Sequence, residues 1–423
     1  MIQKPFAMDR RSVQAGILAL IVLLGLGLRV AYLFISGSWG APPADDGIEY
    51  QILAGNLAAG KGYVTPAGDA YIFRPPGYPF FLAVVYAVTG PNPDAARLAN
   101  ALVSALACLP IYGFARRLWN WKAGLIAAAG LAFHPLLIYL VGLIYPESLT
   151  VFLVALSFYL TLVARQSSRA WPLLLLAATL AELIYVRPNL LIWVLALILW
   201  ALAAFRTPRS RVRAAVIVIG GAVLLIAPWS LRNAIAFGEF TWMSTNGGVT
   251  FWASNNPLAD GGWIEPSAAT WQGADPPADL RGWPDLTPQE SERRFQARGM
   301  QWVRENPGAF LALMPRKLAR AFELSFGNES RQLNLPGAVQ WLYYGFLGVC
   351  LLGAIVSWRQ WRDLLPLYLL TLVFLASTVV YYGSTRQTTM LIPVMIVFAA
   401  KAILWAVESL LRIGRKNPVV VPS

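Results

Sequence analysis

Long apolar segments recur along almost the whole chain and are separated by short polar connections. The first of them, Ala15 to Ile35, is long enough to span a bilayer, and no small-residue cleavage site of a signal peptide follows it. Repeated apolar runs of this length are typical of transmembrane helices. We therefore predict an all-α polytopic membrane protein with about ten transmembrane helices, at residues 15–35, 97–115, 123–141, 148–164, 171–187, 190–205, 214–230, 338–358, 364–382 and 389–408.

Three polar segments are expected on one face of the membrane. The first, residues 36–96, contains an apolar stretch, Tyr78 to Thr89, that is too short to span and is expected to form an interfacial or re-entrant helix. The second, residues 231–337, is rich in Gly, Pro, Trp and Asn and predicts a small exported domain. The third is the short turn Tyr381–Thr389.

The chain is therefore expected to have three parts. Residues 1–230 form an N-terminal transmembrane module that includes the first exported loop, and residues 338–423 form the C-terminal transmembrane helices. Between them, the exported domain of residues 231–337 is expected to contain helices near Glu290–Arg304 and Pro307–Glu323.

The positions of the basic residues predict the orientation in the membrane. The net charge is +13, but the basic residues concentrate in short connections on the face opposite the three polar segments. This is the positive-inside pattern, so the charge reports topology and not a nucleic-acid partner. We expect both termini on the cytoplasmic side of the membrane. The clusters are Lys4/Arg10/Arg11, Arg116/Arg117/Lys122, Arg165/Arg169, Arg206/Arg209/Arg211/Arg213, Arg359/Arg362 and Arg412/Arg415/Lys416.

Composition excludes several classes of site. Only 13% of the 423 residues are charged and 57% are hydrophobic, whereas a soluble domain carries roughly twice that charge. His134 is the only histidine, so neither a histidine metal cluster nor a Ser-His-Asp triad is expected. Cys108 and Cys350 fall inside apolar runs and are expected to be core side chains. The chain has neither a phosphate-binding Walker loop nor a dinucleotide fingerprint.

Carboxylates gather near the exported rim of the membrane. Asp45, Asp46 and Glu49 follow the first span, and Glu147 lies at the start of the fourth span, where a charge is costly. The alternative is an ordinary solvated acidic loop. Two carboxylate sites at one membrane depth favour a shared polar cavity that could deprotonate an acceptor hydroxyl, bind a divalent cation, or do both.

Arginines are expected at the same depth. Arg29, Arg74, Arg187 and Arg386 each lie near an exported span end. Each alone could simply reach toward lipid headgroups. Together they indicate an anion site in the exported leaflet, for which a lipid phosphate is the natural ligand.

The loop Ser244–Pro257, "STNGGVTFWASNNP", could line an acceptor site. The alternative is an ordinary loop rich in Gly and Asn.

Several motifs together resemble glycosyltransferase family 39. Near the start they are "GLGLRVAYLF", "DDGIEYQILAGNLAAGKGYV" and "RPPGYPFFLAVVYAVTG", followed by "FARRLWNWKAGLIAAAGLAFHP" and "YPESL". "PWSLRNAIAFGEF", "STNGGVTFWASNNP" and "WVRENPGAFLALMPRKL" are similar to a bacterial subgroup, and "TRQTTMLIPVMIVFAA" resembles the family's last exported loop. The family includes the protein O-mannosyltransferases and the lipid A aminoarabinose transferase, so the resemblance implies a fold of the GT-C type.

The resemblance also implies residue roles. The family's proposed catalytic base is an Asp four residues before a Tyr, which here is Asp46 before Tyr50. Glu147 matches the acidic residue that helps to position the acceptor or a metal. Members of the aminoarabinose branch carry a Glu where this chain has Phe73, which departs from the pattern of a metal site.

We therefore expect an inverting transferase that moves one sugar from a polyprenyl-phosphate donor to a hydroxyl of a lipid, polysaccharide or protein acceptor at the periplasmic face. The alternatives are a glycolipid transporter or flippase, and a non-catalytic lipid-sugar-binding member of the same fold. The expected catalytic residues are Asp46 and Glu147, which are also the candidate ligands of a divalent metal. The expected donor-binding residues are Arg74, Arg386, Tyr50 and Arg187, and the expected acceptor-binding residues are Asp45, Glu49, Asn246 and Asn255.

Overall fold

The structure is a computed structural model that describes residues 10–203, 205, 207–264, 286–323, 326–328, 331–333 and 337–416. Lys4 and Arg206 of the basic clusters lie outside the described residues, as does part of the expected exported domain.

The N-terminal part consists of helices joined by short loops. Its elements are α1 (Arg10–Ile35), α2 (Asp46–Ala58), α3 (Gly77–Thr89), α4 (Pro93–Leu106), α5 (Cys108–Leu118), α6 (Trp121–Ala132), α7 (Pro135–Tyr139), η1 (Leu140–Gly142), α8 (Glu147–Gln166), α9 (Trp171–Val186), η2 (Pro188–Leu190), α10 (Leu191–Ala203), α11 (Pro208–Ala215), the π-helical turn η3 (Val216–Gly220) and α12 (Gly221–Phe237).

The remaining part is also helical, apart from one short hairpin. Its elements are α13 (Gly247–Ser254), α14 (Pro288–Glu305), α15 (Pro307–Ala321), the antiparallel strands β1 (Phe326–Asn328) and β2 (Arg331–Leu333), α16 (Gly337–Val356), η6 (Trp358–Gln360), α17 (Trp361–Val380), α18 (Thr385–Thr388), η7 (Thr389–Leu391) and α19 (Ile392–Lys416). The helices α14 and α15 lie where the sequence predicted them.

The described residues contain seven helical segments that are long and apolar enough to cross a membrane, or eight if the bent pair Trp121–Ala132 and Pro135–Gly142 is one span. The predicted number of about ten is therefore not confirmed. Two of the predicted spans correspond to Trp171–Val186 and Pro188–Ala203, which are apolar but too short to meet this criterion. The chain is a multi-pass membrane protein. The apolar stretch at Tyr78 to Thr89 is a short helix, α3, as predicted.

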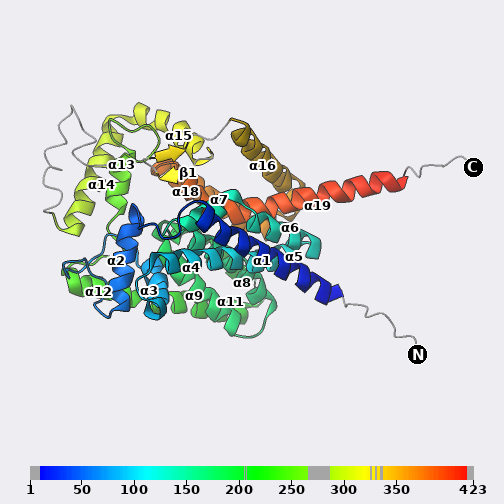
Figure 1. Cartoon of the computed structure of the whole chain (residues 1–423), viewed down its shortest axis with the longest axis horizontal. Coiled ribbons are helices and arrows are strands. Elements are labelled where there is room, and N and C mark those ends of the chain that lie inside the picture. Colours follow the sequence, from blue (N-terminus) through cyan, green and yellow to red (C-terminus); the bar gives the residue numbers. More distant parts are fainter. Residues whose placement is uncertain are drawn as a thin grey trace, which may run out of the picture.

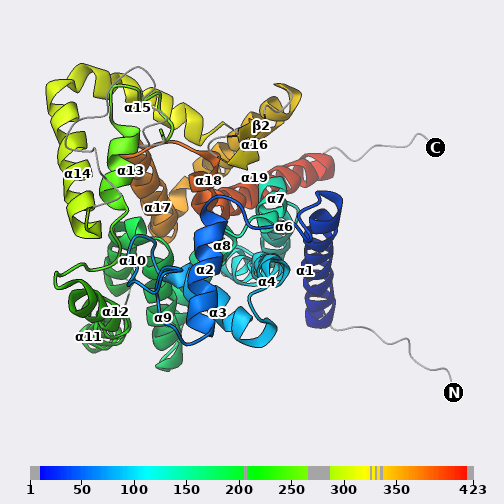
Figure 2. The same cartoon turned by 60° about the vertical axis from the view of Figure 1, so that its left-hand side comes forward.

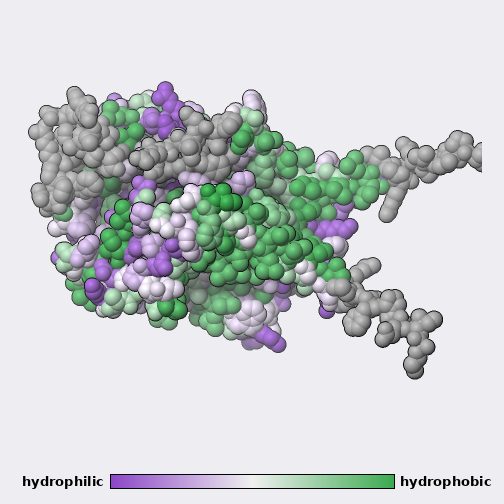
Figure 3. Space-filling view, viewed as in Figure 1, coloured by the Kyte–Doolittle hydropathy of each residue, from purple (hydrophilic) through white to green (hydrophobic). Residues whose placement is uncertain are grey.

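The polar and apolar parts of the surface are separated in space. Both views place α13, α14 and α15 together at one end of the molecule, while the first turn of α1 and the last described turns of α19 lie at the other end (Figures 1 and 2). Hydrophobic residues form a continuous surface around α1 and α6, whereas polar residues gather around α2 (Figure 3). Only 17% of the apolar stretch of α1 is buried inside the protein, as expected for a helix that faces lipid.

Arg29 stabilises the break between α6 and α7. Pro135 starts α7, and the two helices meet at a bend of 48° that frees carbonyl groups at the end of α6. Arg29 is fully buried and donates hydrogen bonds to the carbonyl oxygens of Leu131 and Ala132 and to the hydroxyl of Ser104. The sequence analysis grouped Arg29 with the anion site, but its guanidinium binds the backbone of this break.

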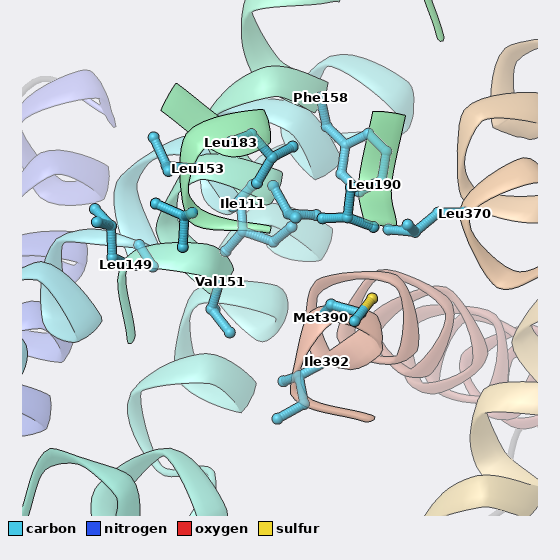
Figure 4. Close-up of a cluster of buried hydrophobic side chains, with 14 of the residues drawn as sticks. Ile111, Leu149, Val151, Leu153, Phe158, Leu183, Leu190, Leu370, Met390 and Ile392 are labelled. Carbon is cyan, nitrogen blue, oxygen red and sulfur yellow. The ribbon is translucent and has the colours of Figure 1, made fainter. Parts of the chain in front are cut away.

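A buried apolar cluster packs against the starts of three segments that carry charged residues. Its side chains come from several helices and meet in one core (Figure 4). Leu149 and Val151 follow Glu147 on α8, Leu190 follows Arg187, and Met390 and Ile392 follow Arg386. The same core therefore fixes the start of each segment that carries one of these three charges. The labelled cluster consists of Ile111, Leu149, Val151, Leu153, Phe158, Leu183, Leu190, Leu370, Met390 and Ile392.

The helices α16 and α19 pack closely at a glycine. A Cβ atom added at Gly353 would lie 1.8 Å from the carbonyl oxygen of Phe398 on α19. Gly345, on the same helix, has no atom within 4 Å of such a Cβ and is exposed. Small residues at membrane helix contacts allow backbones to approach in this way.

We predict that Gly353→Ala lowers the free energy of unfolding by about 1–3 kcal/mol, because the added methyl group overpacks a backbone contact. Gly345→Ala is the matched control and should change stability little. Thermal unfolding in detergent measures both. Equal midpoints for the two variants would contradict the close α16–α19 contact.

Candidate active site

A cavity of about 1100 Å³ is lined by segments from distant parts of the sequence. Asp46 of α2, Arg74 of the loop before α3, Arg187 after α9 and Arg386 of α18 all lie on its wall, and Asn246 lies there just before α13. Most of the residues that the sequence analysis selected are thus brought to one space.

Asp46 is held between two arginines. Its Oδ1 accepts a hydrogen bond from Nη2 of Arg74 and its Oδ2 accepts one from Nη1 of Arg386, each at 2.7 Å. The preceding residue, Asp45, also lines the cavity and has φ of 51°, the one positive φ outside glycine among the described residues. Non-glycine residues avoid this region unless the surrounding structure imposes it, and such residues cluster at functional sites.

Glu49 extends the pairing of Arg74 on the next turn of α2. Its Oε2 lies 2.5 Å from Nε of Arg74, and its Oε1 accepts a hydrogen bond from the Tyr71 hydroxyl at 2.9 Å. Arg232 of α12 donates to the backbone carbonyls of Tyr71 and Tyr63, which fixes the loop that carries Tyr71. Glu49 therefore holds Arg74 in place and is itself held by Tyr71.

Glu147 links the other two arginines from beneath the cavity. Its Oε1 lies 2.5 Å from Nε of Arg386 and 2.6 Å from Nη2 of Arg187. The side chain is fully buried and does not line the cavity, whereas both arginines do. It is also the first residue of α8, where the positive end of the helix favours a carboxylate. Glu147 thus lies behind the arginines, although the sequence analysis expected it at the acceptor.

Two buried polar atoms in this network have no hydrogen-bond partner in the described part of the chain. They are Oε2 of Glu147 and Nε of Arg187. Buried polar groups are normally paired, and because Arg187 lines the cavity, its Nε is available to a ligand or to water.

The network sets the protonation of its members. Burial alone would raise the pKa of Asp46, but the positive charges of Arg386 and Arg74 outweigh that effect and lower its pKa to about 2. Burial raises the pKa of Tyr50 and of Tyr71, so both phenols stay neutral. Asp46 is therefore ionised at physiological pH and a weak proton acceptor in this arrangement.

Aromatic rings cover the guanidinium groups. The Arg386 guanidinium carbon lies 4.0 Å from the centre of the Tyr145 ring, and that of Arg74 lies 5.3 Å from the Phe73 ring and 5.8 Å from the Tyr50 ring. Cation–π contacts of this kind favour arginine over lysine at such sites. Tyr50 therefore lies beside Arg74, a candidate ligand of the phosphate, and its own role in donor binding stays a prediction.

The two asparagines of the predicted acceptor loop have different positions. Asn246 lines the cavity. Asn255 is fully buried away from it: its amide donates to the carbonyls of Phe251 and Val380, and its Oδ1 accepts from Nζ of Lys317. Asn255 joins α13 to α15 and α17, so we assign it no ligand.

Sequence reasoning missed several residues of the cavity wall. Tyr145 directly precedes the "PES" motif and could have been found as an aromatic neighbour of a selected acid. Tyr71 and Glu292 could not be found in this way. The partner of Tyr71, Glu49, lies 22 residues away, and Glu292 reaches the cavity from a separate helix, α14.

The carboxylates do not fit a divalent metal. Within the described ranges, no group of three or more His, Cys, Asp or Glu side chains could hold an ion. Asp46, Glu49 and Glu147 each pair with at least one arginine, so a cation would have to displace guanidinium groups from the site. We therefore derive no step through a metal.

Glu147→Gln should lower the free energy of unfolding by up to about 3 kcal/mol. This value is near the lower end of the range for breaking a buried ion pair, because Arg187 and Arg386 stay partly hydrated. Glu323→Gln is the matched control, since Glu323 is an exposed residue of the cavity wall and should matter by less than about 0.5 kcal/mol. Chemical denaturation in detergent measures both values. A similar small change in the two variants would contradict a structural role of Glu147.

A known protein family matches part of the chain. Residues 73–231 match the family described as dolichyl-phosphate-mannose-protein mannosyltransferase, which is fewer than half of the residues of the chain. No curated protein matches the sequence at a significant level.

Solved structures of an oligosaccharyltransferase from Archaeoglobus fulgidus have a similar fold. One, AglB in complex with an inhibitory peptide and a dolichol-phosphate, has a TM-score of 0.59 and 13% identity, and the match covers 99% of this chain and 53% of that one. A second, tethered to an acceptor peptide, has a TM-score of 0.58, 14% identity and coverages of 97% and 51%. A third, a complex with Zn and sulfate, has a TM-score of 0.57, 14% identity and coverages of 94% and 50%.

This chain spans about half the length of those structures, and at this identity the likeness concerns the fold alone. The family match covers the segment that carries Arg74, Glu147 and Arg187. Together, the family match over this segment and the similar solved structures show a fold of the GT-C type.

Proposed function

We propose that this chain transfers a single sugar from a polyprenyl-phosphate donor to a hydroxyl acceptor, with Asp46 as the general base and with inversion at the anomeric carbon. The observation that carries the proposal is the placement of Asp46 on the wall of a large cavity, between Arg74 and Arg386. The GT-C fold supports a lipid-linked donor, and a solved structure with this fold contains dolichol-phosphate.

The arginines are the groups that would bind the donor phosphate. Guanidinium groups bind phosphate oxygens through paired hydrogen bonds. Arg74, Arg187 and Arg386 all line the cavity, and Nε of Arg187 has no partner among the described residues. Without a ligand, these three positive charges are balanced by Asp46, Glu49 and Glu147. A phosphate must therefore compete with carboxylates for the arginines.

This competition would activate the base. A carboxylate with a pKa of about 2 is a poor proton acceptor near neutral pH. When the phosphate takes hydrogen bonds from Arg386 or Arg74, Asp46 loses part of the positive field that lowers its pKa. The pKa of Asp46 then rises toward the range of an effective base. Donor binding thus precedes activation of the acceptor.

The transfer step balances as a single displacement. Asp46 takes the proton of the acceptor hydroxyl while that oxygen forms a bond to the anomeric carbon. The bond between the anomeric carbon and the phosphate oxygen breaks, and its electron pair leaves with the polyprenyl phosphate. The arginines stabilise the negative charge that develops on that phosphate. Attack from the side opposite the leaving group inverts the anomeric centre.

The other carboxylates have supporting roles in this proposal. Glu147 orients Arg386 and Arg187 from behind, and Glu49 orients Arg74. Asp45 and Asn246 line the cavity, and we propose that they contact the acceptor.

The proposal places the reaction on the periplasmic face of the inner membrane. The first turn of α1 and the last described turns of α19 lie on the side of the molecule opposite α13, α14 and α15 (Figures 1 and 2). The basic clusters of the short connections favour the cytoplasm for the α1 and α19 ends.

Asp46→Asn should lower the rate of transfer by about a hundredfold to ten-thousandfold, because Asn keeps the size of the side chain but cannot take the proton. Asp45→Asn is the matched control and should be much milder, because Asp46 is the carboxylate whose two oxygens pair with Arg74 and Arg386. The measurement is transfer of radiolabelled sugar from a panel of polyprenyl-phosphate donors in membranes that contain each variant.

Thermal unfolding of both variants separates lost chemistry from lost folding. Near-normal transfer by folded Asp46→Asn would remove Asp46 as the base. If Asp45→Asn is as damaging as Asp46→Asn, the two carboxylates act as a coupled pair.

A further inference from the structure

A second part of the cavity wall carries a carboxylate that the network of Asp46 does not use. Glu292 of α14 lines the same cavity, and its Oε2 is buried without a hydrogen-bond partner in the described part of the chain. A buried carboxylate oxygen without a partner is costly to keep. A ligand that donates a hydrogen bond to Oε2 would offset this free-energy cost.

The fold holds Glu292 in place through a close contact between α13 and α14. A Cβ atom at Gly248 would lie 2.2 Å from the backbone oxygen of Glu292, so only glycine allows this approach. A Cβ atom at Gly247 would lie 3.0 Å from Oε1 of Glu292, which places that oxygen against the start of α13. One carboxylate oxygen is thus fixed against α13, and the other, Oε2, is the unpaired one.

The wall of the cavity that Glu292 lines combines acceptors, donors and aromatic rings. Asn246 and Arg320 supply N–H donors, and Arg320 is held by an ion pair with Asp260 at 2.6 Å. Tyr381 and Trp263 add ring surfaces to the same cavity. An ammonium group could donate to Glu292 but could accept nothing from Asn246 or Arg320. Hydroxyl groups both donate and accept hydrogen bonds, so a ring with several hydroxyls can pair with the acceptor of Glu292 and with the donors of Asn246 and Arg320.

We propose that Glu292, with Asn246 and Arg320, forms an acceptor subsite that binds the hydroxyl groups of a carbohydrate. The inference rests on the proposed sugar transfer and identifies the class of its acceptor. Glu292 accepts hydrogen bonds from acceptor hydroxyls, Asn246 and Arg320 donate to them, and one remaining hydroxyl is directed to Asp46. Glu292 is a binding residue and takes no part in proton transfer.

Direct binding of a small uncharged sugar tests the subsite without turnover. The probe is cellobiose, added to the full-length protein in lipid nanodiscs and followed by saturation-transfer difference NMR. The wild type should bind cellobiose, and Glu292→Gln should weaken that binding by at least about tenfold, as expected for loss of a hydrogen bond to a charged group. Glu305→Gln, on the exposed far end of the same helix, is the matched control and should bind as the wild type does.

Other outcomes overturn the subsite. No cellobiose binding by the wild type, or equal binding by wild type and Glu292→Gln, would remove Glu292 as a carbohydrate ligand. Binding of ethanolamine that depends on Glu292, without binding of cellobiose, would show a cation site instead. If Glu292→Gln does not fold, Asn246→Ala should weaken cellobiose binding, and unchanged binding by that variant would equally contradict the proposal.

Undecaprenyl phosphate binding, measured on the same samples, separates this inference from the proposed function. Glu292→Gln should bind undecaprenyl phosphate as well as the wild type does. A wild type that fails to bind this lipid counts against the proposed donor. If the wild type binds undecaprenyl phosphate, and cellobiose binding is the same in the wild type and Glu292→Gln, only the acceptor subsite is contradicted.

Discussion

The pairing of three arginines with three carboxylates is the interaction on which the rest of the structure depends. Arg386 joins Asp46 across 340 residues of sequence and joins Glu147 across 239. Arg74 and Arg187 complete the network from two further loops. Charges near a membrane are costly unless they are paired or used, so the helix ends that carry them must meet at one place.

The apolar core makes this meeting possible. Leu149, Leu190 and Met390 follow three of the charged positions by two to four residues and pack in one cluster (Figure 4). The membrane helices therefore act as a rigid support, while the charges lie at their ends. For the proposed transfer, this network of balanced charges is also a poor resting state, because it holds Asp46 as a weak base. In the proposed mechanism, an incoming phosphate changes the partners of the arginines and leaves the supporting core unchanged.

Much of this site could be predicted because charges are rare in so apolar a chain. Asp46, Arg74, Glu147 and Arg386 stand out at span ends, and all belong to the network that the structure contains. Long-range partners could not be read from the sequence. Arg29 looked like its neighbours at the rim, but its carbonyl partners lie about a hundred residues away at the break before Pro135. The helices Trp171–Val186 and Pro188–Ala203 are also shorter than a membrane span, although the sequence there is predominantly apolar.

The most direct test of the account is the ionisation of Asp46 with and without donor lipid. Isotope-edited infrared spectra of protein with ¹³C-labelled aspartate, taken as the difference between wild type and Asp46→Asn, follow this carboxyl through a pH titration. We predict a pKa of Asp46 near 2 in the free protein and a rise of at least about one unit with undecaprenyl phosphate bound, equivalent to about 1.4 kcal/mol. An unchanged pKa in protein that binds the lipid would contradict the exchange of arginine partners.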